Sequence, residues 1–280
     1  MAFDWWVTHN LEKVFPESER PLDPPLRIVL KAARGETEDA QLALRPRKGS
    51  PYLSAHWIAS DLTGPDGQRI PARQVRVAWQ WYTYVTHNPP WTADPSTYLR
   101  KAPAFFPDAF IESDTARNLK DAWTQPAWIS VRVPETARPG EYTGSLRVTL
   151  RTGTGEEEHA DIPLSLAVWP FAIPEKPTLR HTEWFYPEVL AQYYHLEEWS
   201  EAHWSWIEKV AANMASHRQD MILVPILSLI GVTRTAKGRL SFDFARFDRY
   251  VRIFLKAGLS WLEGGHLISR AGDWNSPFSW

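Results

Sequence analysis

The period of the hydrophobic pattern changes near residue 170, and this change constrains the fold more than any other feature. Before it, apolar and polar residues alternate; after it, apolar residues recur about every 3.6 positions. The segment 170–177 has proline at three of its eight positions, and prolines stop a strand and stiffen a connection. We therefore expect a domain at 1–170, a linker at 171–177 and a second domain at 178–280.

The first 170 residues contain short segments with strand-like alternation, separated by turn signals. Residues 26–33 and 38–45 flank a turn at Arg34-Gly35, and residues 162–168 follow a polar hairpin tip at 153–158 that we expect to be solvated. A half-buried strand from residue 75 is expected to bury Val75, Val77, Trp79 and Trp81 on one face. Several short strands with intervening turns predict a β-sandwich.

One long stretch, residues 86–125, shows no sustained periodicity. It contains Pro89-Pro90-Trp91, the aromatic group at 104–107 and Trp123. A loop of this length is uncommon unless it has a function or packs on another domain, and both interpretations stay open.

The second part reads as alternating strands and helices. Strands are expected at 178–186, 220–227 and 260–268. One helix carries the stripe Trp204, Ile207, Val210, Ala211 and Met214 after a Ser200 N-cap; the next runs over 244–255 and ends at Gly258. The pattern predicts an α/β (TIM-type) barrel that is truncated after its third strand, with two and a half βα units, because a closed barrel needs about 250 residues. We therefore expect the chain to be a fragment.

Composition excludes several classes of function. The formal net charge of −2 disfavours nucleic acid as a partner, and no apolar run approaches the roughly 18–20 residues of a membrane helix. There are no cysteines, so disulfides and thiolate chemistry are excluded. The start at Met1 lacks a signal-peptide pattern, which predicts a cytoplasmic protein if Met1 is the true start. The sequence leaves the oligomeric state open.

The chain has 16 tryptophans, which is an unusually high number. Packing in the core and between domains accounts for tryptophans in most proteins. The functional alternative is sugar binding, because an indole face suits the C–H faces of a pyranose ring.

In a βα barrel the functional groups follow the carboxyl ends of the strands. This rule selects five candidates for a ligand site, of which the last two are separated by a glycine pair that can form a bulge: His181, Glu183, Trp184, Glu263 and His266. The alternative is that the two glutamates only pair with nearby Arg or Lys. The sequence has no phosphate-binding loop, HExxH or GxSxG motif, so we expect no cofactor and no metal.

Several blocks resemble glycoside hydrolase family 123, whose catalytic domain was formerly a domain of unknown function. In the first part these are 123–128 (WTQPAW) and 139–144 (PGEYTG). In the second part they include 181–185 (HTEWF), 247–251 (FDRYV) and 263–267 (EGGHL). The resemblance covers nearly the whole chain and implies an N-terminal β-sandwich followed by the start of a catalytic (β/α)8 barrel.

The resemblance also implies a chemistry: retaining, substrate-assisted β-N-acetylgalactosaminidase activity on terminal N-acetylhexosaminides, with a carbohydrate as ligand. In that family the 2-acetamido oxygen of the substrate attacks the anomeric carbon, an Asp orients it, and the following Glu protonates the leaving oxygen. This chain has no Asp-Glu dipeptide, so no catalytic residue is assigned and the chain alone is expected to be inactive. The alternative is a non-catalytic carbohydrate-binding or scaffold protein that uses the Trp-rich β-sandwich.

Overall fold

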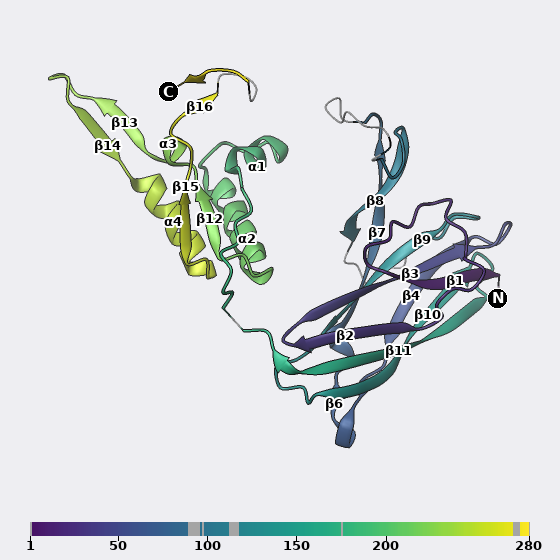
Figure 1. Ribbon diagram of the computed structural model, residues 1–280. Coiled ribbons are helices and arrows are strands. Elements are labelled where there is room, and N and C mark those ends of the chain that lie inside the picture. The colour runs from purple at the N-terminus through teal and green to yellow at the C-terminus, as the bar shows by residue number, and fades with distance from the viewer. Residues whose placement is uncertain are drawn as a thin grey trace. The chain divides into compact units, whose positions relative to one another are not determined.

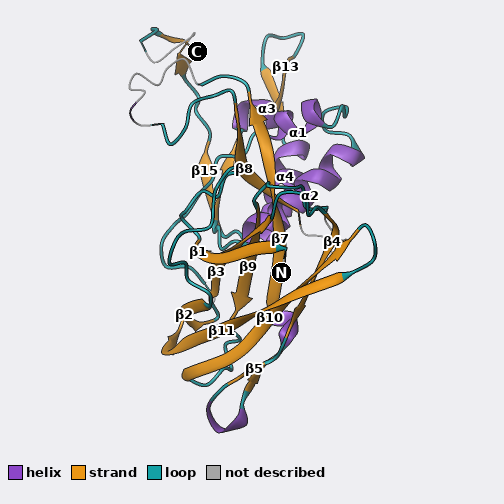
Figure 2. Ribbon diagram, turned by 90° about the vertical axis from the view of Figure 1, so that its right-hand side faces the viewer, coloured by secondary structure: helices purple, strands orange, loops and turns teal. Residues whose placement is uncertain are grey.

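The computed structural model describes residues 2–88, 96, 98–111, 118–174, 176–270 and 275–279 (Figure 1). The chain divides into two compact units, Met1–Ile173 (unit 1) and Pro174–Trp280 (unit 2). Pro89, Pro90 and Trp91 of the long aperiodic stretch lie outside the described residues. Figure 2 shows that unit 1 is built almost entirely of strands and that the α-helices belong to unit 2.

Unit 1 contains two sheets. The first is antiparallel throughout and has the order β1 (Phe3–His9), β3 (Thr37–Pro46), β9 (Gln125–Arg132), β7 (Val75–Val85), β8 (Ala104–Ile111). The second has the order β2 (Ile28–Arg34), β11 (Glu157–Ala172), β10 (Gly140–Thr152), β5 (Leu62–Thr63), β6 (Arg69–Ile70), with β4 (Tyr52–Ala59) also paired to β10. Two short 3-10 helices, η1 (Pro65–Gly67) and η2 (Ala72–Gln74), lie in the connections.

The two sheets share one hydrophobic core, the arrangement of a β-sandwich. Leu42 and Ile129 enter the core from the first sheet, and Leu146 enters it from the second. Along β11 the alternation predicted from the sequence is confirmed: Ile162, Leu164, Leu166 and Val168 are buried. Successive side chains of a strand point to opposite faces, so this alternation places one face of β11 in the core.

The prediction for the end of β7 is wrong. Trp81 was expected to be buried with Trp79, but its side chain is 47% exposed, whereas Gln80 is buried. The pairing of β7 with β8 shifts between Gln80 and Tyr82. A bulge of this kind inserts one extra residue and reverses the alternation beyond it, so Tyr82 turns inward and Trp81 outward.

The strand β11 also continues further than its prolines suggest. Pro170 was expected to stop it, but the strand runs to Ala172. The pairing of β11 with β10 ends at Val168, so the missing N–H of Pro170 breaks no hydrogen bond to that neighbour. On the other side, Ala172 still pairs with Arg34 of β2 after a register shift.

Unit 2 mixes helices and short strands. In chain order it contains α1 (Pro187–Tyr193), α2 (Glu201–Ser216), β12 (Met221–Val224), α3 (Ile226–Leu229), β13 (Gly231–Arg234), β14 (Leu240–Asp243), α4 (Ala245–Ala257), β15 (Trp261–Gly264), β16 (Ser269–Arg270) and β17 (Phe278–Ser279). β12 and β15 pair in parallel, whereas β13 with β14 and β16 with β17 pair antiparallel. Within the described part of the chain, no helix is long and apolar enough to cross a bilayer.

The two long helices of unit 2 are those predicted from periodicity. The Ser200 side chain accepts a hydrogen bond from the backbone N–H of His203 (3.3 Å), as an N-cap does. Gly258 ends α4 with φ of 116°, a left-handed conformation that favours glycine. A second core joins the buried faces of α2 and α4 to one face of β12, with Ile207, Phe254 and Ile222 as representative members.

The predicted strand at 178–186 is mostly absent. Within it, only Thr182 forms a bridge, a parallel one with Met221 of β12. The neighbouring strand β12 is only four residues long, which limits pairing, and α1 then begins at Pro187, a residue suited to the first helical position. The predicted strand at 260–268 is likewise reduced to β15.

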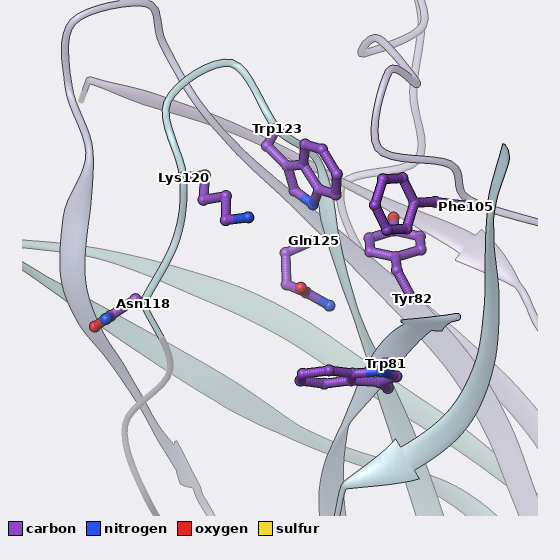
Figure 3. A pocket seen from close by; sticks show the side chains of 7 residues that line it. All are labelled: Trp81, Tyr82, Phe105, Asn118, Lys120, Trp123 and Gln125. Carbon is purple, nitrogen blue, oxygen red and sulfur yellow. The ribbon is translucent and has the colours of Figure 1, made fainter. Parts of the chain in front are cut away.

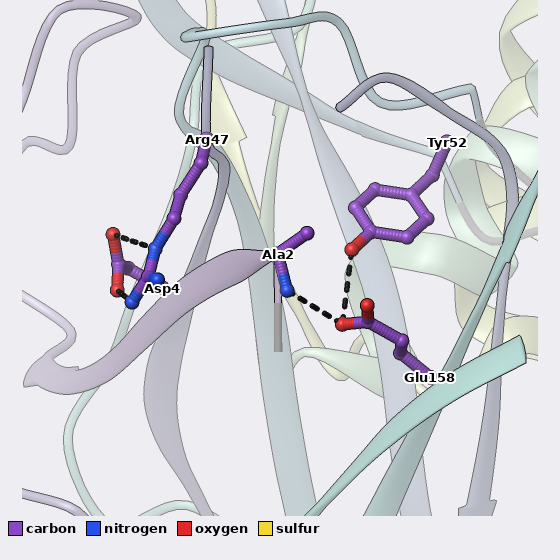
Figure 4. A network of polar contacts seen from close by, with 5 residues as sticks. All are labelled: Ala2, Asp4, Arg47, Tyr52 and Glu158. Carbon is purple, nitrogen blue, oxygen red and sulfur yellow. Dashed lines mark hydrogen bonds and ion pairs between the residues drawn. The ribbon is translucent and has the colours of Figure 1, made fainter. Parts of the chain in front are cut away.

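Polar contacts tie the N-terminal strand of unit 1 to its neighbours (Figure 4). The Glu158 carboxylate accepts hydrogen bonds from the backbone N–H of Ala2 (2.7 Å) and from the hydroxyl of buried Tyr52 (3.2 Å). Asp4 of β1 forms an ion pair with Arg47 (2.9 Å). Glu158 is therefore more than part of a solvated hairpin tip, because it links the start of the chain to β4.

We expect Tyr52→Phe to lower the free energy of unfolding by about 1 kcal/mol, because it removes a hydrogen bond to a carboxylate and keeps the ring. Burial, and then the nearby Glu158, raise the pKa of Tyr52 well above its usual value, so the hydroxyl remains a donor at neutral pH. Urea unfolding measures the loss. Tyr84→Phe, at a ring that is 54% exposed, is the matched control and should change little; equal losses in both variants would contradict the role given to Tyr52.

Candidate functional site

The candidate site lies where three parallel segments of unit 2 end. β12 pairs in parallel with β15, and the bridge from Thr182 to Met221 adds the preceding segment on the other side of β12. Trp184 comes two residues after this bridge, and Glu263 lies near the end of β15. The carboxyl ends of parallel strands meet at one edge of a sheet, so residues far apart in the sequence come together there.

Three predicted residues contact one another at this edge and are called here the Trp184 cluster: Trp184, Glu263 and His266. The indole Nε1 of Trp184 donates a hydrogen bond to Oε2 of Glu263 (3.3 Å). The His266 ring lies edge-on to the indole, with ring centroids 5.4 Å apart and planes at 85°. Trp184 remains 49% exposed, so much of its indole surface is accessible to a ligand.

Gly265, the second of the two glycines after Glu263, allows this arrangement. The backbone N–H of Gly265 donates to the carbonyl of Val224 (2.9 Å), and a Cβ at Gly265 would lie 2.8 Å from that same oxygen. A side chain at this position would therefore clash with backbone, so the close approach requires glycine. The chain turns here, and Glu263 and His266 both reach Trp184.

The other two predicted residues, His181 and Glu183, contact each other. Nε2 of His181 lies 3.1 Å from Oε1 of Glu183, and both side chains are largely exposed. The structure therefore brings three of the five candidates into one cluster and forms a separate pair from the remaining two.

Asp220, which was not among the predicted site residues, positions this segment. Its carboxylate is almost fully buried and accepts hydrogen bonds from the backbone N–H of His181 (2.8 Å) and from Nη1 of Arg180 (3.0 Å). Its carbonyl accepts the backbone N–H groups of Ser260 (2.9 Å) and Trp261 (3.0 Å). One residue thus holds the segment before Trp184 and the strand that carries Glu263.

Gln219, also buried, connects the same segment to β12 by hydrogen bonds. Its side-chain amide donates to the carbonyls of Glu183 (3.3 Å) and Met221 (2.8 Å). A signal for both residues exists in the sequence: two polar residues directly precede the apolar run of a buried strand. Buried polar groups at such a place need hydrogen-bond partners and often determine how neighbouring segments align.

The chemistry available to the Trp184 cluster is that of polyol binding. An exposed indole face packs against the C–H groups of a sugar ring, and a neighbouring carboxylate accepts hydrogen bonds from its hydroxyls. Among the described residues, no group of three or more His, Asp or Glu side chains could hold a metal ion.

We expect Asp220→Ala to lower the free energy of unfolding of unit 2 by about 2 kcal/mol, because buried donors lose a charged acceptor. The α-helices of the structure belong to unit 2, so far-ultraviolet circular dichroism in guanidinium follows this unit. Asp248→Ala, which removes an exposed ion pair with Arg252 on α4, is the control and should cost under about 1 kcal/mol. A loss no larger at Asp220 than at Asp248 would show that Asp220 does not hold the segments together.

Comparison with family models agrees with the resemblance found in the sequence. A model of the glycoside hydrolase 123 N-terminal domain matches residues 15–150, and a model of the glycoside hydrolase 123 catalytic domain matches residues 184–276. The second match includes the whole Trp184 cluster. No curated protein matches the chain significantly.

Among solved structures, a family 123 glycoside hydrolase from Clostridium perfringens, described in work on glycolipid glycan hydrolysis, superposes with a TM-score of 0.76. It shares 17% sequence identity, and the match covers 92% of this chain and 46% of that protein. At this identity the likeness shows the fold alone, and the chain spans about half of the other protein's length. A protein of unknown function from Porphyromonas gingivalis is 13% identical over 64% of this chain and 52% of its own, but its TM-score of 0.29 carries no argument.

Proposed function

Because this chain belongs to glycoside hydrolase family 123, we propose that it is the N-terminal part of a glycosidase and that the Trp184 cluster forms part of its sugar-binding site. The observation that carries the proposal is the position of the cluster. A half-exposed indole, a carboxylate and an imidazole meet at the carboxyl ends of parallel strands, the edge at which βα barrels bind their substrates.

The proposal includes the rest of the barrel. The bridge at Thr182, then β12, then β15 lie in chain order and run parallel, as the first three strands of a (β/α)8 barrel do. We keep the boundaries predicted from the sequence: a β-sandwich domain at 1–170, a linker at 171–177 and a partial barrel at 178–280. The remaining strands would come from a longer protein, of which this chain would be one part.

We propose terminal N-acetylhexosaminides, including those of glycolipid glycans, as the substrate class, hydrolysed with retention and with help from the acetamido group of the substrate. The sequence resemblance supports this choice, and so does the glycolipid glycan hydrolysis described for the Clostridium perfringens protein. The Asp-Glu pair that this chemistry needs does not occur in these 280 residues, so the proposal places it on a later strand. The Trp184 cluster then binds the sugar and performs no proton transfer itself.

A version of the protein that extends through the remaining barrel should hydrolyse 4-nitrophenyl N-acetyl-β-galactosaminide, and the 280-residue chain should not. General acid–base catalysis alone is worth about 10²–10⁴ in rate, so the difference is large. In the extended version, Trp184→Ala should lower kcat/KM at least about tenfold, mainly through KM, because it removes a binding surface. Trp169→Ala, at another half-exposed indole, is the control and should leave kcat/KM unchanged.

Two results would contradict this proposal. Equal turnover by the 280-residue chain would place catalysis within these residues. An extended protein that binds but does not hydrolyse any N-acetylhexosaminide would favour the non-catalytic carbohydrate-binding alternative.

A further inference from the structure

Unit 1 contains an aromatic hollow, whose residues are distant in the sequence from the Trp184 cluster. Its volume is about 140 Å³, and its lining includes Trp81, Tyr82, Phe105, Lys120, Trp123 and Gln125 (Figure 3). The residues come from β7, β8, the segment that precedes β9 and the first residue of β9. Trp81 reaches it because the bulge in β7 turns this indole outward.

The aromatic wall of the hollow is held in place by its neighbours. The Trp123 ring meets Tyr82 and Phe105 edge-on, at centroid distances of 5.8 and 5.4 Å. The Tyr82 hydroxyl donates to the carbonyls of Val14 (3.0 Å) and Thr124 (2.9 Å). A wall fixed in this way loses little conformational freedom when a ligand binds.

One polar side chain of the hollow, that of Lys120, carries a positive charge. Figure 3 shows the Lys120 ammonium directed into the hollow, beside Trp123 and Gln125, with Trp81 on the facing side. The ammonium lies 4.9 Å from the centre of the Trp123 ring, a cation–π contact that orients it. Among the described residues that line the hollow, Lys120 is the one that carries a charge, and this charge is positive.

We propose that this hollow binds a single pyranose ring that carries a carboxylate, as in a hexuronate or a sialic acid residue. The ring would stack on the exposed face of Trp81, and its carboxylate would approach the Lys120 ammonium. The volume supports one small ring, because sites for drug-sized ligands measure about 300–1,000 Å³. The positive lining supports an anion, because a neutral sugar leaves the ammonium without a charged partner among the described residues.

The test is titration of the 280-residue chain with methyl β-D-glucuronide and methyl β-D-glucoside. The first sugar has a carboxylate group where the second has a hydroxymethyl group. Calorimetry should show glucuronide binding at least about tenfold tighter than glucoside binding, with weaker binding at high salt. Lys120→Gln should reduce the affinity for the glucuronide to that for the glucoside. Trp81→Ala should weaken binding of the glucuronide at least about tenfold, and Trp81→Phe should restore part of it.

Control variants distinguish binding at this hollow from non-specific effects of losing a lysine or a tryptophan. Lys48→Gln and Trp169→Ala change an exposed lysine and a half-exposed tryptophan elsewhere in unit 1 and should leave glucuronide binding unchanged. Repeating the titration with Trp184→Ala removes any sugar that binds at the Trp184 cluster; the preference for the glucuronide should persist, so this outcome is independent of the proposed glycosidase site. The inference is overturned if the wild-type chain binds neither sugar, if it binds both equally, or if thermally stable Trp81→Ala binds the glucuronide as the wild type does.

Discussion

The arrangement of unit 2 depends on the buried carboxylate of Asp220 and on the carbonyl of the same residue. The carboxylate holds the backbone at His181, and the carbonyl receives the first two N–H groups of the segment that becomes β15. Three parallel segments are therefore aligned at a single residue. Since Trp184 follows the first of these segments and Glu263 lies in the third, their hydrogen bond requires this alignment.

Arg180 also stabilises the alignment of these segments around Asp220. Its guanidinium pairs with Asp220 and lies 4.2 Å from the centre of the Trp261 ring, so it joins the first segment to β15 as well. In unit 1, a different feature of the backbone determines the position of a tryptophan. There a bulge in β7 breaks the alternation of the strand, and the break exposes an indole beside a lysine. In each unit a local feature of the backbone leaves a half-exposed tryptophan near a charged side chain.

The sequence predicted those elements whose own residues determine them. The helix that begins after Ser200 and the helix that ends at Gly258 carry their boundaries in local residue types, and both are confirmed. The buried face of β11 follows from alternation alone. The bulge at Trp81 was missed because it arises from the pairing of β7 with β8, and β8 lies in a stretch with no periodicity.

The candidate site could be predicted only in part from the sequence. Trp184, Glu263 and His266 were selected because a barrel places strand ends together, and the structure joins them. His181 and Glu183 were selected by the same rule but pair with each other, because their segment forms only one bridge to β12. Asp220 and Gln219 were missed because two polar residues before an apolar run do not reveal which backbone groups elsewhere in the chain they bind.

The most direct test of the central claim is a crystal structure of the extended protein in complex with N-acetylgalactosamine. We predict that the pyranose ring lies against the indole of Trp184 and that a sugar hydroxyl donates a hydrogen bond to Glu263. A sugar bound at a different edge of the barrel, or a Trp184 indole covered by protein in the complete barrel, would contradict it.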